Sequence, residues 1–246
     1  MIIDFERRFL FLKSTKTAGT SIEIILSRYC TKQSIVTPTV DEELRATYNG
    51  RPPQNYLPAN QSLGLSENLQ IFYVPPWGNV AFFNHMSLEE VISQIGVEKF
   101  EALFSFSFTR HPVKRALSSY TWIVASNRDA YKNFTISEHR LAFCEMLRSN
   151  FESTRKWSYS EKYAKEVTKV YLYEQISMAL EDIFTQLKIF GAAQLELPMA
   201  KAGFENILGF PREALLDGAS IGIIKEKCEW EFTEIYAENV DQSALY

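Results

Sequence analysis

Long apolar runs and paired cysteines are both missing from this chain of 246 residues. No stretch approaches the roughly 20 apolar residues that a helix needs to span a bilayer, and no basic and apolar leader opens the sequence. The cysteines, Cys30, Cys144 and Cys228, lie far apart and form no C-x-x-C pair or cysteine–histidine cluster. These absences predict reduced thiols, no structural zinc, no membrane span and a cytoplasmic location.

The sequence also lacks a basic surplus, a linker and an internal repeat. The net charge of -4 argues against general binding of nucleic acid, which requires a basic surface. No Gly/Ser-rich, proline-rich or charged linker divides the chain, and the hydrophobic content of 46% suffices for a sizeable core. We therefore expect a single domain over residues 1–246.

Strand-like and helix-like segments alternate along the chain. Short runs of aromatic and β-branched residues predict strands at Phe9–Leu12, Ile71–Val74, Val80–Phe83, Leu103–Thr109 and Val167–Tyr173. Periodicity and capping residues predict helices at Thr20–Arg28, Leu88–Ile95, Pro112–Val124, Glu138–Ser149, Gln175–Leu187 and Lys225–Asn239. This order predicts an α/β fold with a central, mainly parallel sheet flanked by helices. The polar residues 31–70 fit neither pattern and are expected to form a substrate-facing insertion.

The segment "STKTAGTS" (14–21) joins the first predicted strand to the first predicted helix. Such a turn aims backbone N–H groups and the positive end of the helix dipole at one point, where an anion can bind. In a Walker A loop the lysine directly precedes the hydroxyl residue at the start of the helix, whereas Lys16 comes four residues before Thr20. A kinase or NTPase is therefore disfavoured. The structural alternative is an ordinary turn in which Gly19 only relieves backbone strain.

A second basic motif follows the predicted strand Leu103–Thr109 in "TRHPVKRALSSY". Pro112 suits the first turn of a helix, so Arg110 lies at the end of the strand and Ser118 two turns into the helix. The planar guanidinium of Arg110 and the hydroxyl of Ser118 could together bind one phosphate. We expect Arg115 to form an internal ion pair instead. The alternative interpretation is a helix start with basic residues by chance.

His85 lies in "FFNHMSLEE", just before a predicted helix whose capping box is Ser87 and Glu90. A neutral imidazole there can accept a proton at physiological pH. Of the other histidines, His111 is constrained by the proline that follows it, and His139 sits in a polar helix start. A buried structural histidine is the alternative, in which case a carboxylate of residues 31–70 would be the base.

Together these motifs resemble the sulfotransferases that use 3′-phosphoadenosine 5′-phosphosulfate (PAPS). "FLKSTKTAGTSIE" is similar to the 5′-phosphosulfate loop of that family, and "TRHPVKRALSSY" to its 3′-phosphate motif R-x-P-x-x-R-x-x-S-x-Y. The carbohydrate-type branch and its soluble bacterial relatives are the most similar, although Thr15 stands where they commonly have proline. "YLYEQISMALEDIFTQL" and "EFTEIYAENVD" are similar to a later strand and helix and to the C-terminal helix.

The resemblance implies a P-loop-like three-layer fold and transfer of a sulfuryl group to an acceptor hydroxyl, without a metal. His85 would deprotonate the acceptor, as a similarly placed histidine does in the carbohydrate-type enzymes. Lys16 would neutralise the leaving oxygen, while Arg110 and Ser118 would hold the 3′-phosphate. The loop that would bind the 5′-phosphosulfate consists of Lys16, Thr17, Ala18, Gly19, Thr20 and Ser21.

The expected acceptor is a carbohydrate or another polyhydroxylated metabolite, because Arg45 or Arg51 could pair with a carboxylate or sulfate on a sugar. Aromatic residues could instead line a pocket for a lipid or small natural product: Tyr48, Tyr56, Trp77 and Phe83. Lys201, in "LPMAKAGF", is a candidate for a loop that covers the nucleotide. A P-loop nucleotide kinase and a non-catalytic nucleotide-binding module remain the alternative functions.

Overall fold

The computed structural model describes residues 1–57, 81–153, 166–189, 196–200, 204 and 206–237. They belong to two compact units, which we call the sheet unit (Met1–Thr109 and Tyr163–Ala200) and the helical unit (Arg110–Lys162 and Lys201–Tyr246). The single domain expected over 1–246 stays a prediction. The predicted strand Ile71–Val74, Trp77 and Lys201 lie outside the described residues.

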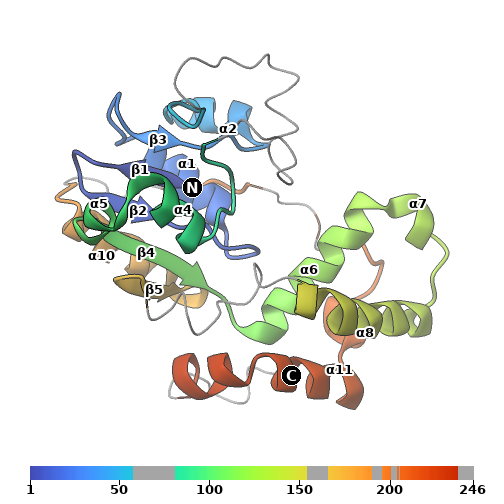
Figure 1. Cartoon of the computed structure of the whole chain (residues 1–246). Coiled ribbons are helices and arrows are strands. Elements are labelled where there is room, and N and C mark those ends of the chain that lie inside the picture. Colours follow the sequence, from blue (N-terminus) through green and yellow to red (C-terminus); the bar gives the residue numbers. More distant parts are fainter. Residues whose placement is uncertain (58–80, 154–165, 190–195, 201–203, 205, 238–246) are drawn as a thin grey trace. The chain divides into compact units, whose positions relative to one another are not determined.

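The sheet unit contains a five-stranded sheet with the strand order β3-β1-β2-β4-β5 (Figure 1). β2 pairs with β4, and β4 with β5, in parallel, whereas β1 is antiparallel to both of its neighbours. Four of these strands therefore run in one direction, which confirms a mixed α/β fold with a mostly parallel central sheet. The strand bounds are β1 Ile2–Asp4, β2 Phe9–Phe11, β3 Ile35–Val36, β4 Phe104–Thr109 and β5 Lys169–Leu172.

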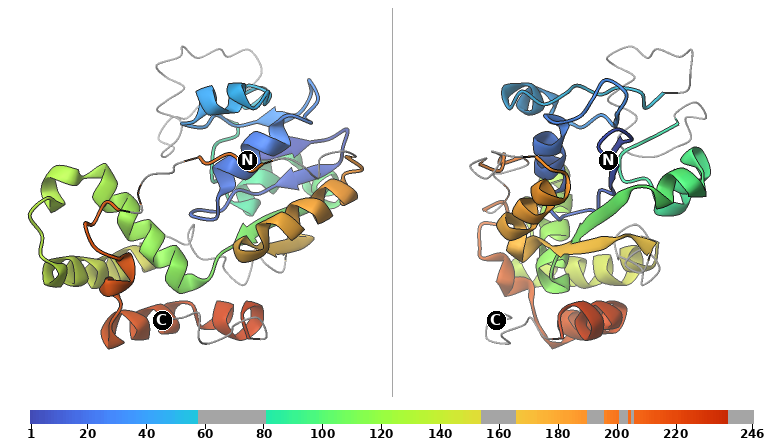
Figure 2. Two further views of the ribbon diagram at one scale, coloured as in Figure 1. Left: turned by 180° about the vertical axis from the view of Figure 1, so that it is seen from behind. Right: turned by 90° about the vertical axis from the view of Figure 1, so that its left-hand side faces the viewer.

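Helices cover both faces of this sheet, as Figures 1 and 2 show from opposite sides. Phe9 and Phe11 point to the face covered by α1 (Gly19–Ser27) and α10 (Ile176–Gln186). Leu10, between them, points to the other face and packs with α4 (Leu88–Ile95). The side chains of β2 thus contribute to two hydrophobic layers, one on each face of the sheet, because successive side chains of a strand point to opposite faces. The remaining helices of the unit are α2 Glu42–Thr47, α5 Val97–Glu101 and the 3₁₀ turn η2 Tyr173–Gln175.

The segment before α4 differs from the prediction. Residues 81–83 form no strand, so the described part of the predicted strand Val80–Phe83 is wrong. Phe82 instead donates its backbone N–H to the Tyr56 carbonyl and buries its ring in the α4 layer. The expected capping box of α4 is confirmed, because Ser87 Oγ accepts from Glu90 N at 3.2 Å and Glu90 Oε2 accepts from Ser87 N at 2.7 Å.

The helical unit has its own hydrophobic core, formed by residues of α6, α8 and α11 and the segments that follow them. Its elements are α6 Pro112–Ser126, α7 Arg128–Tyr131, α8 Ile136–Ser153, the 3₁₀ turn η3 Arg212–Leu215, α11 Gly218–Lys227 and the π-helical turn η4 Glu231–Ile235. The predicted helix Lys225–Asn239 is helical over most of its described part, but its start and its continuity differ from the prediction, because α11 covers residues 225–227 and η4 covers Glu231–Ile235. A capping box of Asp217 and Ser220 starts α11 earlier, and the helix ends at Lys227. No helix among the described residues is both long and apolar enough to cross a membrane.

Candidate functional site

Residues 12–14 are fixed to the carboxyl ends of β2 and β4. Leu12 donates its N–H to the Phe106 carbonyl at 2.9 Å, and the Ser107 hydroxyl donates to the Leu12 carbonyl. The Ser14 hydroxyl donates to the Phe108 carbonyl at 2.5 Å. The loop that follows therefore begins at the carboxyl edge of parallel strands, the edge at which ligands bind in open α/β sheets.

This loop leads directly into the N-terminus of α1. Lys16 and Ala18 have φ angles of 60° and 56°, and Ala18 is the N-cap residue. The Ile22 N–H donates to the Ala18 carbonyl, so the amides of the preceding turn have no intrahelical acceptor. No side chain among the described residues caps the helix, and its first turn carries no carboxylate. When left-handed residues precede a helix whose first turn is uncapped, the backbone N–H groups of that turn can donate hydrogen bonds to an anion.

The hydroxyl groups of the loop have two different roles. Thr17 Oγ1 lies 2.6 Å from Ser14 Oγ and also donates to the Ser14 carbonyl at 3.3 Å, so this hydroxyl stabilises the turn itself. Thr20 and Ser21 are both buried in the first turn of α1, where they flank the uncapped amides. The structure thus brings the predicted loop residues Lys16 to Ser21 together, with Lys16 and Ala18 half-buried and the others buried.

Gly19 is needed for space and not for its backbone angle. The described glycines with positive φ are Gly96 and Gly209, and the left-handed residues of the loop are Lys16 and Ala18. A Cβ atom at Gly19 would lie 2.7 Å from Lys13 Cγ and 3.1 Å from the Ser14 carbonyl oxygen. The interpretation of Gly19 as a strain-relieving residue is therefore wrong, because the glycine lets the Lys13 side chain pass over the helix.

His85 contacts the same loop. Its Nδ1 atom lies 3.0 Å from the main-chain carbonyl oxygen of Lys13. Because a carbonyl oxygen only accepts hydrogen bonds, Nδ1 carries the hydrogen, and in the neutral ring the lone pair is then on Nε2. The backbone of His85 is left-handed, with a φ angle of 61°, and its side chain is half-buried. The structure therefore joins His85 to the loop, as a base for chemistry at the loop would require.

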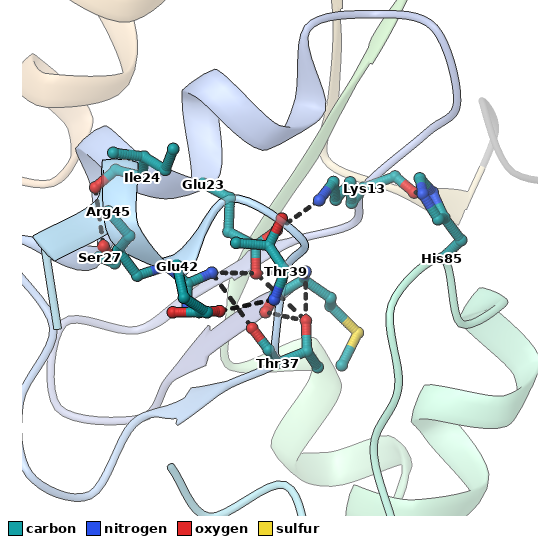
Figure 3. A network of polar contacts seen from close by, with 10 residues as sticks. Lys13, Glu23, Ile24, Ser27, Thr37, Thr39, Glu42, Arg45 and His85 are labelled. Carbon is teal, nitrogen blue, oxygen red and sulfur yellow. Dashed lines mark hydrogen bonds and ion pairs between the residues drawn. The ribbon is translucent and has the colours of Figure 1, made fainter. Parts of the chain in front are cut away.

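A buried cluster of charges that the sequence did not reveal lies behind the loop, around Glu23 (Figure 3). Lys13 Nζ lies 2.7 Å from Glu23 Oε2, and Arg45 Nη2 and the Met1 amino group lie 3.2 and 3.0 Å from Oε1. The Thr37 hydroxyl donates to the same oxygen. The available signal was the position of Glu23 inside the apolar run "SIEIIL", because an unpaired carboxylate is rarely buried.

The cluster keeps Glu23 ionised. Burial alone would raise the pKa of its carboxyl group, but the nearby charges of Lys13, Met1 and Arg45 outweigh burial and lower the pKa to about 2. Arg45 is completely buried and also pairs with Glu42 at 3.2 Å. Arg45 therefore cannot bind an acceptor at the surface, so this expectation is wrong. Arg51 is half-buried and its Nε donates to the Cys30 carbonyl at 2.7 Å, so its pairing with an acceptor stays a prediction.

The second basic motif belongs to the helical unit. Arg110 directly follows Thr109 in sequence and is half-buried, and Ser118 is half-buried on α6. Arg115, on the buried side of that helix, forms a two-pronged ion pair with Glu231 at 2.5 and 2.7 Å. The predicted internal ion pair of Arg115 is thus confirmed.

His111 and His139 are both structural. His111 is the buried N-cap residue of α6 and packs edge-on against the rings of Phe232 and Tyr236. The Nδ1 atom of His139 lies 2.9 Å from the Tyr120 hydroxyl, within a cluster of aromatic rings. Of the three histidines, His85 is the one that reaches solvent appreciably.

The cysteines are free, buried thiols. Burial raises the pKa of Cys30 and of Cys228 to about 12 and raises that of Cys144 as well. These thiols are therefore poor nucleophiles at neutral pH, because the thiolate is the reactive form. Within the described ranges, no group of three or more His, Cys, Asp or Glu residues is arranged to hold a metal ion.

No protein-family model, curated protein or solved structure matches this chain. A function can therefore be argued only from the residues and contacts described above. Two of them bear directly on chemistry: the uncapped first turn of α1, and the histidine bound to the loop that leads into it.

Proposed function

We propose that this protein is a PAPS-dependent sulfotransferase with a P-loop-like fold, which transfers a sulfuryl group to a hydroxyl of a carbohydrate or another polyhydroxylated metabolite. The observation that carries the proposal is a single arrangement in the sheet unit. The uncapped, buried N-terminus of α1 follows the carboxyl end of β2, and His85 is hydrogen-bonded to the same loop. One loop thus combines donors for an anion with a side chain that can accept a proton.

The backbone amides of residues 17–21 suit a phosphosulfate group because they lack intrahelical acceptors and lie at the positive end of the α1 dipole. The Thr20 and Ser21 hydroxyls complete the anion cradle. Lys16, on the left-handed turn before them, supplies a positive charge where the leaving oxygen becomes negative. Charge stabilisation of this kind dominates transfer reactions that have a dispersed anionic transition state.

His85 removes the proton of the acceptor hydroxyl in this mechanism. Its Nδ1–H is held by the Lys13 carbonyl, so the basic atom of the neutral ring is Nε2. Glu23 is unsuited to this role because its carboxyl group is buried, ion-paired and has a pKa of about 2. A carboxylate with so low a pKa is a weak base near neutral pH.

Recognition of the 3′-phosphate is assigned to Arg110 and Ser118 on the sequence pattern R-x-P-x-x-R-x-x-S-x-Y. Within the helical unit, the burial of Arg110, Arg115 and Ser118 is consistent with separate roles for these residues. Arg115 is buried and ion-paired with Glu231, whereas Arg110 and Ser118 are only half-buried. A guanidinium and a hydroxyl are suitable donors for a phosphate dianion.

Nucleotide binding tests this proposal first. Adenosine 3′,5′-bisphosphate should bind without magnesium and more tightly than AMP, as measured by calorimetry with the intact chain. A panel of sugars, other polyhydroxylated metabolites and lipid alcohols, incubated with ³⁵S-labelled PAPS, then identifies the acceptor class. Turnover of magnesium-ATP without binding of the bisphosphate would indicate a kinase and overturn the proposal. Bisphosphate binding without transfer to any acceptor would favour a non-catalytic nucleotide-binding module.

A further inference from the structure

Lys13 makes two contacts that point in opposite directions (Figure 3). Its ammonium group lies 2.7 Å from Glu23 Oε2, and its main-chain carbonyl accepts from His85 Nδ1 at 3.0 Å. The same residue thus connects a buried carboxylate to the candidate base. Neither motif of the sequence assigned a role to Lys13.

The side chain of Lys13 is held in one conformation. Its side chain is 1% exposed, and that of Glu23 is fully buried. The carboxylate is held in turn by Arg45 Nη2 at 3.2 Å and by the Thr37 hydroxyl. Gly19 provides the space in which the lysine chain crosses α1. A lysine normally has several rotatable bonds free, so a buried partner at its end removes most of that freedom.

Fixing both ends of Lys13 also fixes the position of its carbonyl. Leu12, the residue before it, is bound on both its N–H and its carbonyl by β4. The carbonyl of Lys13 is therefore held between an anchored main chain and an anchored side chain. The tautomer of a histidine is set by the hydrogen bond that one ring nitrogen makes, so an immobile acceptor at Nδ1 selects the Nδ1–H form.

We infer that Lys13 is a positioning residue which, held by Glu23, keeps His85 in the Nδ1–H tautomer and its lone pair on Nε2. The inference rests on the proposed function where it treats His85 as the base. The tautomer itself requires neither a donor nor an acceptor, so it can be measured even if the enzyme assignment fails. Arg45 extends this network to α2, in the segment expected to face the acceptor.

The first test is the tautomer in the intact wild-type protein. Long-range ¹H–¹⁵N correlation spectra distinguish protonated from unprotonated ring nitrogens, and the chain has only three histidines. A His85→Asn variant assigns the His85 signals by their disappearance. At a pH where the ring is neutral, the ¹⁵N signal typical of an unprotonated nitrogen should belong to Nε2 of His85. An unprotonated Nδ1 instead would overturn the inference.

The second test removes the anchor. Lys13→Met keeps the main chain and a side chain of similar length but deletes the ammonium group. The ¹⁵N signal typical of an unprotonated nitrogen should then be shared by both ring nitrogens of His85. Lys169→Met is the matched control, because Lys169 forms a 2.8 Å ion pair with Asp182 on the surface of the same unit. The control should leave the His85 signals unchanged. A His85 tautomer that is unaffected in folded Lys13→Met would overturn the role of Lys13.

Gly19→Ala provides a variant that retains every charge. Its added Cβ would collide with Lys13 Cγ and should displace the lysine, so it should mix the two tautomers as Lys13→Met does. Both Lys13→Met and Gly19→Ala can be checked for folding by the dispersion of the same spectra. A folded Gly19→Ala protein with a pure Nδ1–H tautomer would contradict the inference even if Lys13→Met failed to fold. The signals of His139, buried in the helical unit, serve as the internal reference.

Discussion

Three residues of the candidate site have left-handed backbone conformations: Lys16, Ala18 and His85, with φ angles of 60°, 56° and 61°. A non-glycine residue in a sparsely populated region costs on the order of 1–3 kcal/mol and persists only where its surroundings determine it. Lysine and alanine are not among the residues enriched in this region, so the conformations of Lys16 and Ala18 could not be predicted from their residue types. The sequence thus predicts which residues form the loop, but their conformations depend on contacts with β4 and with Lys13.

Replacing His85 with asparagine tests the assignment of the base. Asparagine tolerates a left-handed backbone better than alanine does, so His85→Asn removes the imidazole with little added strain. We expect sulfuryl transfer to fall by about 10²–10⁴-fold, the usual effect of losing a positioned base. Initial rates with PAPS measure this loss, and thermal melting should show a nearly unchanged Tm. A large fall in Tm, with activity lost in proportion to unfolded protein, would make His85 structural and move the base to a carboxylate of residues 31–70.

Lys16→Ala separates binding from chemistry. The positive charge of Lys16 should matter most when the leaving oxygen becomes negative, so kcat should fall by roughly 10²–10³-fold. The affinity for adenosine 3′,5′-bisphosphate should change only a few-fold, because an interaction that strengthens mainly in the transition state affects kcat more than binding. Steady-state kinetics and calorimetry provide both numbers, with the exposed Lys32→Ala as the control. Equal losses in affinity and kcat would contradict the proposed role.

Elements with strong local signals were predicted closely. The range of α4 agrees with the prediction at both ends because its capping box marks the start and Gly96 marks the end. The aromatic run of β4 and the proline at the start of α6 also predicted the bounds of these two elements to within a few residues. β3 and α2 were missed because they are short and depend on distant partners. β3 exists by pairing with β1, and α2 buries Arg45 against Glu23.

The second basic motif, which contains Arg110 and the α6 residue Ser118, offers a test of nucleotide discrimination. Arg110→Ala and Ser118→Ala should each reduce the preference for adenosine 3′,5′-bisphosphate over AMP while leaving AMP affinity nearly unchanged. For Arg110 the preference should fall by about 10–100-fold, since a charge-assisted hydrogen bond contributes roughly 1.5–3 kcal/mol. Calorimetric titration of both nucleotides gives the ratio, and Arg128→Ala, exposed on α7, is the control. An unchanged ratio in the Arg110 variant would refute its assignment to the 3′-phosphate.

The ion pair of Arg115 and Glu231 joins α6 to η4, and both side chains are 2% exposed. Removing one partner leaves an uncompensated buried charge, so Arg115→Met should destabilise the helical unit by about 3–5 kcal/mol. Adding Glu231→Met should restore part of that loss, because the remaining charge then disappears as well. Urea unfolding, followed by hydrogen exchange of the α6 and α8 amides, measures both variants. A double variant as unstable as Arg115→Met would show that shape, and not charge, dominates this contact.

At the scale of the whole chain, the division into two units left no trace in the sequence. Unit boundaries are usually sought in Gly-, Pro- or polar-rich linkers. Here the chain passes from the sheet unit to the helical unit between Thr109 and Arg110. This boundary lies inside the second basic motif, where a strand is followed directly by a helix. The hydrophobic clusters of the folded chain follow the division, because two of them belong to the sheet unit and the third to the helical unit. Composition and periodicity cannot tell one such core from two.

Acid should weaken the sheet unit through Glu23. The pKa of this carboxyl group is about 2 in the folded protein and near its ordinary value of about 4.3 in the unfolded chain. A lowered folded-state pKa means that the ionised group stabilises the fold above pH of about 4, and that this contribution is lost as the pH falls towards about 2.

Glu23→Gln isolates this contribution from the other carboxylates. The difference in unfolding free energy between wild type and Glu23→Gln should be largest at neutral pH and should shrink steadily as the pH approaches about 2. Hydrogen exchange of the β2 and β4 amides reports on the sheet unit alone, measured across this pH range. Asp182→Asn, which removes a half-buried carboxylate of α10 that pairs with Lys169, should show a much smaller difference because ion pairs near the surface contribute little. A pH-independent difference for Glu23→Gln would mean that Glu23 stabilises the unit through packing and hydrogen bonds, and not through its charge.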